Sequence, residues 1–305
     1  MNNFLHKAVA AFIALTAAGF AHAQENPAKQ VYMAANAHFD TQWRWNVRQS
    51  IGEFLPNTLY QNFALMEQYP DYKFSFEGAV KHYWTKEYYP HLYSTLVKYV
   101  KEGRWYPAGA SWDANDFNVP SSESNFKNIL LAEEFYKEEF GVKSYDIMLP
   151  DCFGFGYALP SIASHCGVFA FHTQKLQWRN NPFYEGGRKW PFEFGIWEGV
   201  DGSRILMAPD GSSYGWNPNG DISDDPKLEA KVNASAVGAA LRYYGTKSSR
   251  LHGDQGGSPL PSAVEAIASS IPNAKKYGLR FATTIDIFND YKHELTGDKL
   301  PVYNG

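Results

Sequence analysis

The sequence predicts an α/β domain with parallel strands that close toward a barrel. Short apolar segments typical of buried strands alternate with longer segments whose apolar residues recur at helical spacing. About seven such units follow one another, which favours a barrel over a short open sheet. Three loops rich in acidic, aromatic and glycine residues come directly after strand-like segments, where such folds place their functional loops.

The first 23 residues are typical of an export signal. Lys7 gives a positive start, residues 8–20 form an apolar run, and Ala21-His22-Ala23 is a small-x-small cleavage site. The run is shorter than the ~20 residues that a membrane-spanning helix needs. We therefore expect cleavage, rather than the alternative of an uncleaved anchor, and an exported, periplasmic or extracellular protein with no membrane partner. Residues 24–305 then form one large domain.

The composition argues against a nucleic-acid binder. The chain has 28 basic and 32 acidic residues without a Lys/Arg block, so it lacks the basic footprint of that class. Aromatic residues make up 16% of the chain. Most of them should fill the core, but several stand beside polar residues in expected loops, which favours carbohydrate contact. Only two cysteines are present, Cys152 and Cys166, and whether they pair stays open.

The expected elements begin with a strand at residues 31–34 and a helix at 47–66, whose apolar residues recur in steps of four. A helix at 121–140 is the clearest, because Pro120 precedes it, its apolar residues share one face and Gly141 follows it. The other expected strands are 72–76, 104–109, 145–148, 168–172, 192–197, 205–208 and 279–282. The other expected helices are a stretch that ends at Lys101, 226–243 and 262–270.

The first loop places His38 and Asp40 at alternate positions after the opening strand. In an extended chain, alternate side chains point the same way, so an imidazole and a carboxylate at this spacing can converge on one metal ion. Trp43 and Trp45 follow at once, and aromatic faces beside cation ligands suit a sugar. The alternative is a surface loop with ordinary polar residues.

The third loop places Asp151 at a strand end, followed by Gly154 and Gly156, which let a substrate approach the backbone closely. Asp151 could also be a cap or turn residue for the segment that begins near Tyr157. The second loop, residues 111–118, contributes Asp116.

Three segments in this order resemble the glycoside hydrolase family 38 α-mannosidases: AHFDTQWRW, GRWYPAGASWDANDFNVPSSES and LPDCFGFGYALPSI. The similarity covers residues 31–303 and makes 24–305 a catalytic domain. The resemblance implies a seven-stranded parallel β/α barrel, bound zinc, and hydrolysis of terminal α-mannosides in a mannose-containing oligosaccharide or glycan with retention of configuration.

The family's functional residues carry over position by position. The resemblance implies that His38, Asp40 and Asp151 bind zinc, and that Asp151 is also the nucleophile. It further implies that Trp43 stacks on the mannose ring and that Asp116 binds sugar. The segment HGDQGGSP offers Asp254 as the acid/base. His252, in the same segment, is better interpreted as a solvated loop histidine than as an extra ligand.

Two departures from the family pattern matter. The family's fourth zinc ligand is a histidine from a region beyond residue 305, and only His293 follows Asp254 here. The sequence is then either a fragment of a longer gene product, or its zinc site is incomplete, with water as the missing ligand. Phe155 and Gly156 also replace the family's commoner His-Ser.

Two alternatives to an α-mannosidase remain at this point. The first is a mannose-binding pseudoenzyme or an inactive truncated fragment. The second is a zinc-dependent polysaccharide deacetylase, which would need a histidine pair on one helix turn, and the sequence has no such pair.

Overall fold

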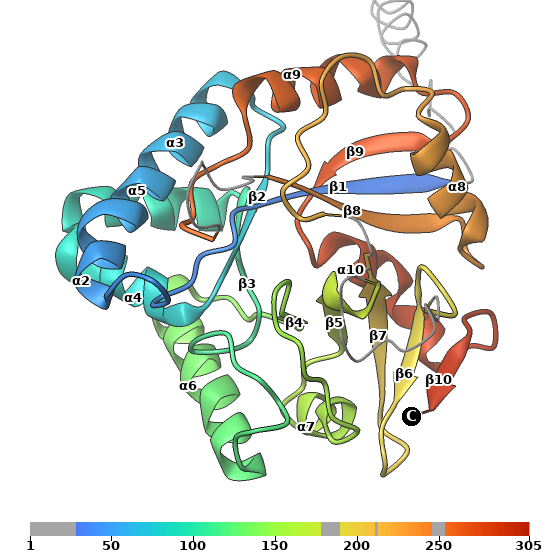
Figure 1. Ribbon diagram of the computed structural model, residues 1–305, viewed down its shortest axis with the longest axis horizontal. Helices are drawn as coiled ribbons and strands as arrows, with labels where there is room; N and C mark the ends of the chain where they lie inside the picture. The colour runs from blue at the N-terminus through green and yellow to red at the C-terminus, as the bar shows by residue number, and fades with distance from the viewer. Residues whose placement is uncertain (1–28, 178–189, 211–212, 246–253, 305) are drawn as a thin grey trace, which may run out of the picture.

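A computed structural model describes residues 29–177, 190–210, 213–245 and 254–304. Over this part of the chain the strands form two five-stranded sheets (Figure 1). The first has the order β3-β2-β1-β8, with β9 also paired to β1, and the second has the order β10-β6-β7-β5-β4. All neighbouring strands are parallel except β6 and β7.

The strands of the first sheet are β1 (Gln30–Asn36), β2 (Phe74–Glu77), β3 (Trp105–Ala108), β8 (Ala239–Gly245) and β9 (Gly278–Ala282). Those of the second are β4 (Asp146–Met148), β5 (Ala170–Thr173), β6 (Gly195–Glu198), β7 (Arg204–Pro209) and β10 (Val302–Asn304). The larger helices are α3 (Leu55–Gln68), α4 (Ala79–Tyr88), α5 (Pro90–Lys101), α6 (Ser122–Phe140), α8 (Pro226–Ala234) and α9 (Pro261–Ser270). The shorter helices are α2 (Val47–Gln49), η1 (Ser50–Phe54), α7 (Leu159–His165), η2 (Lys175–Gln177), η3 (Ile271–Asn273), α10 (Asp286–Tyr291) and η4 (Lys292–Thr296).

Helix α6 forms where its sequence predicts. The Ser121 hydroxyl accepts a hydrogen bond from the backbone N–H of Ser124 at 3.2 Å, which satisfies one of the free donors of the first turn. Gly141 ends the helix with a φ of +71°, a conformation that glycine adopts without steric cost. None of the described helices is long and apolar enough to cross a membrane.

Strand β1 is buried on both faces, and its alternate residues belong to two different cores. Val31 and Met33 pack in a cluster with the helices outside the first sheet, whereas Tyr32 and Ala34 pack in an inner cluster. The inner cluster also contains Leu206, from β7 of the second sheet. The two sheets therefore enclose one apolar interior, as the walls of a barrel would.

A closed seven-stranded parallel barrel is not confirmed, because the strand ladder is interrupted where the two sheets meet. Between β3 and β4, the N–H groups of Gly109 and Ala110 donate to the Oδ1 and backbone oxygen of Asp146, at 3.0 and 2.6 Å. Between β7 and β8, the N–H of Tyr243 donates to Asp210 Oδ2 at 3.1 Å. At both junctions a carboxylate therefore accepts a backbone N–H, and between β3 and β4 one backbone–backbone bond accompanies it.

The carboxylate of Asp146 also joins the two sheets inside the molecule. Asp146 Oδ2 lies 2.6 Å from Nε2 of His172 in β5 and accepts from the Thr284 hydroxyl at 2.9 Å. His172 contacts the Tyr243 hydroxyl of β8 through Nδ1. Each of these groups is buried, so their polar atoms need one another as partners.

Two element predictions are wrong. The strands predicted at 192–197 and 205–208 were expected to be parallel, but β6 and β7 pair antiparallel because only residues 199–203 connect them, too few for a crossover. The helix predicted at 226–243 ends at Ala234, and β8 begins at Ala239 after a turn in which Gly238 has a φ of +67°. All seven residues of β8 are buried, so no polar alternation marks it as a strand.

Candidate active site at the ends of β1, β4 and β8

His38 lies two residues beyond β1, where the chain is held by a short pairing with the segment around Asp254. Phe39 forms an antiparallel bridge with Gln255, and Asp40 donates its N–H to the Asp254 carbonyl at 2.9 Å. Gly256 donates its N–H to the His38 carbonyl at 3.0 Å. These backbone bonds bring the first sequence motif and the HGDQGGSP segment together.

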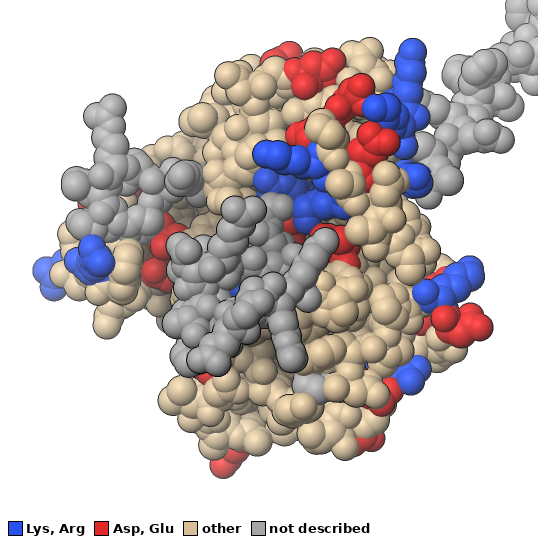
Figure 2. Space-filling view, turned by 45° about the vertical axis from the view of Figure 1, so that its right-hand side comes forward, with Lys and Arg blue, Asp and Glu red and all other residues tan. Residues whose placement is uncertain are grey.

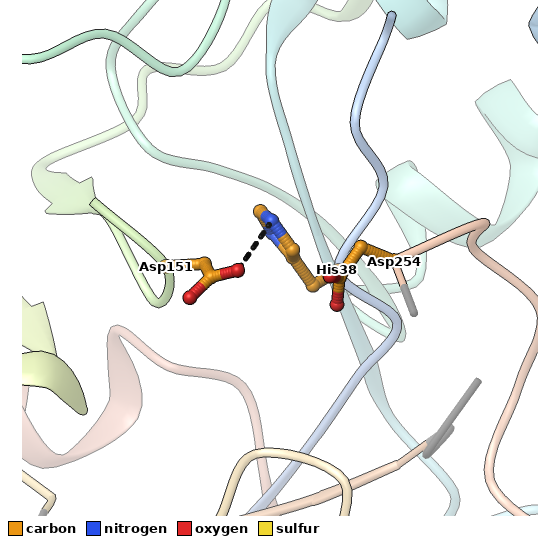
Figure 3. Close-up of side chains that lie close together, drawn as sticks. All are labelled: His38, Asp151 and Asp254. Carbon is orange, nitrogen blue, oxygen red and sulfur yellow. Dashed lines mark ion pairs between the residues drawn. The ribbon is translucent and has the colours of Figure 1, made fainter. Parts of the chain in front are cut away.

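Three side chains converge at this point: His38, Asp151 and Asp254. One ligand atom from each lies within 4.8 Å of the others. Figure 3 shows the three side chains side by side, approaching from three separate segments of the chain. His38 Nε2 lies 3.9 Å from Asp151 Oδ2 and 3.3 Å from Asp40 Oδ1, yet it makes no hydrogen bond.

The other imidazole nitrogen of His38 faces a buried carboxylate. Nδ1 lies 3.1 Å from Glu77 Oε1, and Lys81 Nζ lies 3.0 Å from the same oxygen. Burial acts to raise the pKa of Glu77, but Lys81 and His38 outweigh it and lower the pKa to about 2. Burial likewise acts to lower the pKa of His38, but the neighbouring carboxylates of Asp40 and Glu77 outweigh burial and raise it. A carboxylate therefore faces each imidazole nitrogen.

Asp151 follows β4 and its two oxygens meet different partners. Oδ1 forms an ion pair with the buried Lys175, and Oδ2 faces His38 and the Tyr214 hydroxyl, at 3.4 Å from the latter. The same hydroxyl donates to Asp254 Oδ1 at 2.7 Å, so Tyr214 links both carboxylates. Burial raises the pKa of Asp254, which favours a protonated carboxyl there.

Asp254 has a φ of +73°. This left-handed conformation is strained for a residue with a side chain, and within the described part of the chain Asp254 is the only non-glycine residue that adopts it. Backbone hydrogen bonds on both sides hold Asp254 in this conformation. In it, the Asp254 carboxylate lies close to His38 and Asp151.

Trp43 and Asp116 lie on loops that adjoin this cluster. Trp43 is 51% exposed and makes an edge-to-face contact with the buried Trp45 ring, so Trp43 offers an aromatic surface that a neighbouring ring supports. The loop of Trp43 is tied to residues 111–118 by the Thr41 hydroxyl, which donates to Asp113 Oδ2 at 2.7 Å. A side chain at Gly154 would lie 2.8 Å from both carboxylate oxygens of Asp116, so Asp116 packs directly against the loop of Asp151.

Three further features bear on the sequence predictions. Cys152 and Cys166 are free thiols. The export signal at residues 1–23 and His252 lie outside the described residues.

Three side chains that no sequence motif indicated also contact the site residues: Glu77, Lys175 and Tyr214. Glu77 alone carries a signal, because it is a carboxylate at a strand end followed by glycine.

The cluster fits a divalent metal ion of the zinc type. An unprotonated imidazole nitrogen and carboxylate oxygens are zinc's ordinary oxygen and nitrogen ligands in proteins. His38 Nε2 is buried without a hydrogen-bond partner and faces two carboxylates, and a third lies within the same group. Such an arrangement leaves a lone pair that a metal ion would satisfy.

The comparison with known families decides the affiliation of the chain. The model of the glycosyl hydrolases family 38 N-terminal domain matches residues 28–305. The chain belongs to glycoside hydrolase family 38. The family suggested by the three sequence segments is thereby confirmed, and those segments contain His38, Asp40, Asp116 and Asp151.

Curated relatives in family 38 share about a third of their residues with the matched part of the chain. Alpha-mannosidase G of Dictyostelium discoideum is 30% identical over 85% of this chain, and the alpha-mannosidase of Saccharomyces cerevisiae is 30% identical over 90%. Human alpha-mannosidase 2C1 is 34% identical over 61%. The chain spans 23% of the length of the first relative, 25% of the second and 17% of the third.

Solved structures support the same fold at lower identity. An alpha-mannosidase from Enterococcus faecalis V583 superposes with a TM-score of 0.70 at 19% identity, over 91% of this chain and 30% of that chain. A Mycobacterium smegmatis protein assigned as a polysaccharide deacetylase superposes with a TM-score of 0.55 at 10% identity, over 92% of this chain and 96% of that chain. At these identities the likeness concerns the fold alone, a mixed α/β fold with parallel strands.

Proposed function

We propose that the protein is a zinc-dependent α-mannosidase that cleaves terminal α-mannosides of glycans with retention of configuration. One observation carries the proposal: His38, Asp151 and Asp254 converge to within 4.8 Å in a chain that belongs to family 38. The relatives named alpha-mannosidase support the substrate class.

His38, Asp40 and Asp151 would hold the ion, and Asp254 lies close enough to join them. A bound zinc ion would supply a Lewis acid that orients sugar hydroxyl groups. The backbone bonds between residues 38–40 and residues 254–256 would hold these side chains in position before the ion binds.

Asp151 and Asp254 take the roles of nucleophile and proton donor in this proposal. Retaining glycosidases place the two carboxyl groups about 5–5.5 Å apart, and inverting ones about 6.5–9.5 Å apart. The single Tyr214 hydroxyl lies 3.4 Å from Asp151 and 2.7 Å from Asp254, and this closeness supports the retaining arrangement. Asp151 would attack the anomeric carbon and form a glycosyl ester while Asp254, whose pKa burial raises, protonates the leaving oxygen. Lys175 and Tyr214 orient Asp151 for the attack.

Trp43 would stack on the apolar face of the mannose ring, and Asp116 would accept hydrogen bonds from its hydroxyl groups. Acidic and basic side chains are interspersed on the face in Figure 2, which supports an uncharged glycan as the partner rather than nucleic acid. We also propose that residues 1–23 direct export and are removed, which N-terminal sequencing of the protein from its natural source would test.

The test compares the native protein with Asp151→Asn, Asp254→Asn and Asp201→Asn on an aryl α-mannoside. Asp151→Asn should lose activity by ~10³-fold or more, since it removes the nucleophile without changing its size. Asp201→Asn is the matched control, because Asp201 bonds only to Ser161, His165 and Ser203 within the described residues, away from the cluster. Chelation should abolish the activity, zinc should restore it, and NMR should detect the α-anomer first.

Other outcomes would contradict the proposal. Retained activity in Asp151→Asn would remove Asp151 as the nucleophile. Mannose binding by the zinc-loaded protein without turnover, measured by calorimetry, would indicate a mannose-binding pseudoenzyme. Because the chain spans only 23% and 25% of the length of two α-mannosidase relatives, turnover has to be measured on this chain itself. Release of acetate from an acetylated glycan, without release of sugar, would indicate a deacetylase.

A further inference from the structure

Glu77 is a fully buried carboxylate whose Oε1 meets three donors. His38 Nδ1 lies 3.1 Å away, the backbone N–H of Phe39 donates at 3.2 Å, and Lys81 Nζ donates at 3.0 Å. Two of these three donors belong to the first loop of the candidate site. The other oxygen, Oε2, is buried without a hydrogen-bond partner. Glu77 thus directs one oxygen at the segment that carries the proposed metal ligands.

The strand register puts Glu77 beside His38. β1 and β2 pair in parallel with Asn36 opposite Ser75, so the residue two positions beyond each, His38 and Glu77, stand level with one another. Gly78 follows with a φ of +86° and lets α4 begin at once. Lys81 lies one helical turn further, which returns its ammonium group to Glu77.

Lys81 is fully buried, and aromatic rings flank its ammonium group. Its Nζ lies 5.4 and 5.3 Å from the centres of the Phe39 and Phe76 rings. A buried ion pair of this kind adds little net stability compared with apolar side chains of the same size. Because this pair contacts the ring of His38 and the backbone of Phe39, it has a role that packing alone does not require.

We propose that Glu77, charge-balanced by Lys81, is a positioning residue of the metal site. It accepts the Nδ1 proton of His38, which fixes the ring and leaves Nε2 as the atom that faces Asp40, Asp151 and a metal ion. Carboxylates that hold the second nitrogen of a ligand histidine contribute ~10–100-fold to metal affinity. This inference rests on the metal site of the proposed function and adds to it the group that orients the imidazole.

Two double variants test the role without leaving a buried charge unpaired. Glu77→Leu/Lys81→Met removes the acceptor for Nδ1, whereas Glu77→Gln/Lys81→Met removes the ion pair but keeps an amide oxygen as acceptor. Zinc affinity is measured at neutral pH by competition with a chromophoric chelator. We expect the Leu variant to bind zinc ~10–100-fold more weakly than the native protein and the Gln variant to recover most of that loss.

A second measurement uses the unmodified chain, so it holds even if a variant does not fold. In ¹⁵N-histidine-labelled, zinc-loaded protein, His38 should retain its proton on Nδ1 and bind the metal through Nε2, with the signal assigned by its loss in His38→Gln. A proton on Nε2 would overturn the proposal. Equal zinc affinities in the native protein and the Leu variant, or equal losses in both variants, would also overturn it.

These readouts need no substrate. If the native protein bound zinc with Nδ1 protonated but did not hydrolyse mannosides, the proposed function would fail and the role of Glu77 would stand. If it hydrolysed mannosides while the Leu variant kept native zinc affinity, the role of Glu77 would fail and the proposed function would stand.

Discussion

His82 in α4 is a fully buried imidazole with a partner on each ring nitrogen. Trp105 Nε1 donates to Nε2 at 3.1 Å, and Nδ1 lies 3.0 Å from the Gly78 carbonyl, so the neutral ring with its proton on Nδ1 satisfies both contacts. A second proton on Nε2 would oppose the Trp105 N–H. Burial lowers the pKa of His82 to about 4.

Stability should therefore fall as the pH falls through the range in which only the unfolded chain binds this proton. The unfolded imidazole titrates near pH 6.5, so the contribution of His82 is complete above that pH and is lost progressively toward pH 4. The loss should reach about 3 kcal/mol. The measurement is the free energy of unfolding in urea at several pH values between 7 and 4.5, for the native protein and His82→Gln.

The comparison with His82→Gln isolates this contribution from opposing ones. Burial raises the pKa of Glu133 to about 7, so that carboxyl makes the protein less stable as the pH rises through the same range. Both proteins contain Glu133, so its effect cancels in the difference. If the two stability curves ran parallel between pH 7 and 4.5, His82 would not be the buried neutral group described above.

At the same scale, the sequence could identify the proposed metal ligands but not the side chains that hold them in place. His38, Asp40 and Asp151 stand at strand ends in recognisable segments, and the backbone pairing of Phe39 with Gln255 brings Asp254 to them. Tyr214 and Lys175 come from segments without a motif. Their proximity depends on tertiary packing that no local pattern encodes, which is why the sequence did not point to them.

Gly245, at the end of β8, lies opposite Asn36 of β1 and directly against its backbone. A Cβ at this position would lie 1.8 Å from the backbone oxygen of Asn36 and 2.9 Å from its carbonyl carbon. Because these are backbone atoms, the strands would have to separate at the end that leads to the candidate site. Gly245→Ala should therefore lower the free energy of unfolding by about 2–3 kcal/mol.

Gly52 provides the matched control for this prediction. A Cβ there would meet nothing within 4 Å, and the residue lies in a helical segment, η1. Gly52→Ala should leave stability unchanged or raise it by about 0.5–1 kcal/mol. The measurement is the free energy of unfolding in urea for the two variants and the native protein. Equal stabilities for Gly245→Ala and the native protein would mean that the strands separate without cost.

Strand β8 and helix α6 show which secondary-structure elements the sequence pattern could and could not predict. The helix predicted at 121–140 formed as α6, because its caps and its single apolar face are local features. β8 was missed because it is buried on both faces, so its residues Ala239–Tyr244 lack the alternation that identifies a strand and continue the apolar content of α8. The direction of β6 depended on the short connection to β7, which periodicity does not reveal.

For the whole molecule, polar groups join two sheets whose strand ladders are separate. The buried carboxylate of Asp146 in β4 contacts His172 of its own sheet and Thr284, which follows β9 of the other sheet. The candidate metal site makes a further contact of this kind between the sheets. His38 and Asp254 follow β1 and β8 of the first sheet, whereas Asp151 follows β4 of the second.

A metal ion bound by these three side chains would therefore stabilise the contact between the sheets, and this can be measured without substrate. A ligand that binds only the folded state at 1,000 times its Kd adds about 4 kcal/mol to the free energy of unfolding. For a chain of this size, that corresponds to a rise in Tm on the order of 10 °C. We expect this rise in calorimetry when zinc is added to the metal-free protein and its loss when the zinc is chelated.

Two variants assign the effect to the cluster. Asp151→Asn removes the second sheet's charged ligand while keeping the size of the side chain, so zinc should raise its Tm by only a small part of the native increment. Asp201→Asn, on the turn between β6 and β7, should respond as the native protein does because its contacts are confined to Ser161, His165 and Ser203 among the described residues. An equal rise in Asp151→Asn and native protein would place the zinc elsewhere, and the contact between the two sheets would then depend on the hydrogen bonds of Asp146 and Asp210 and on apolar packing.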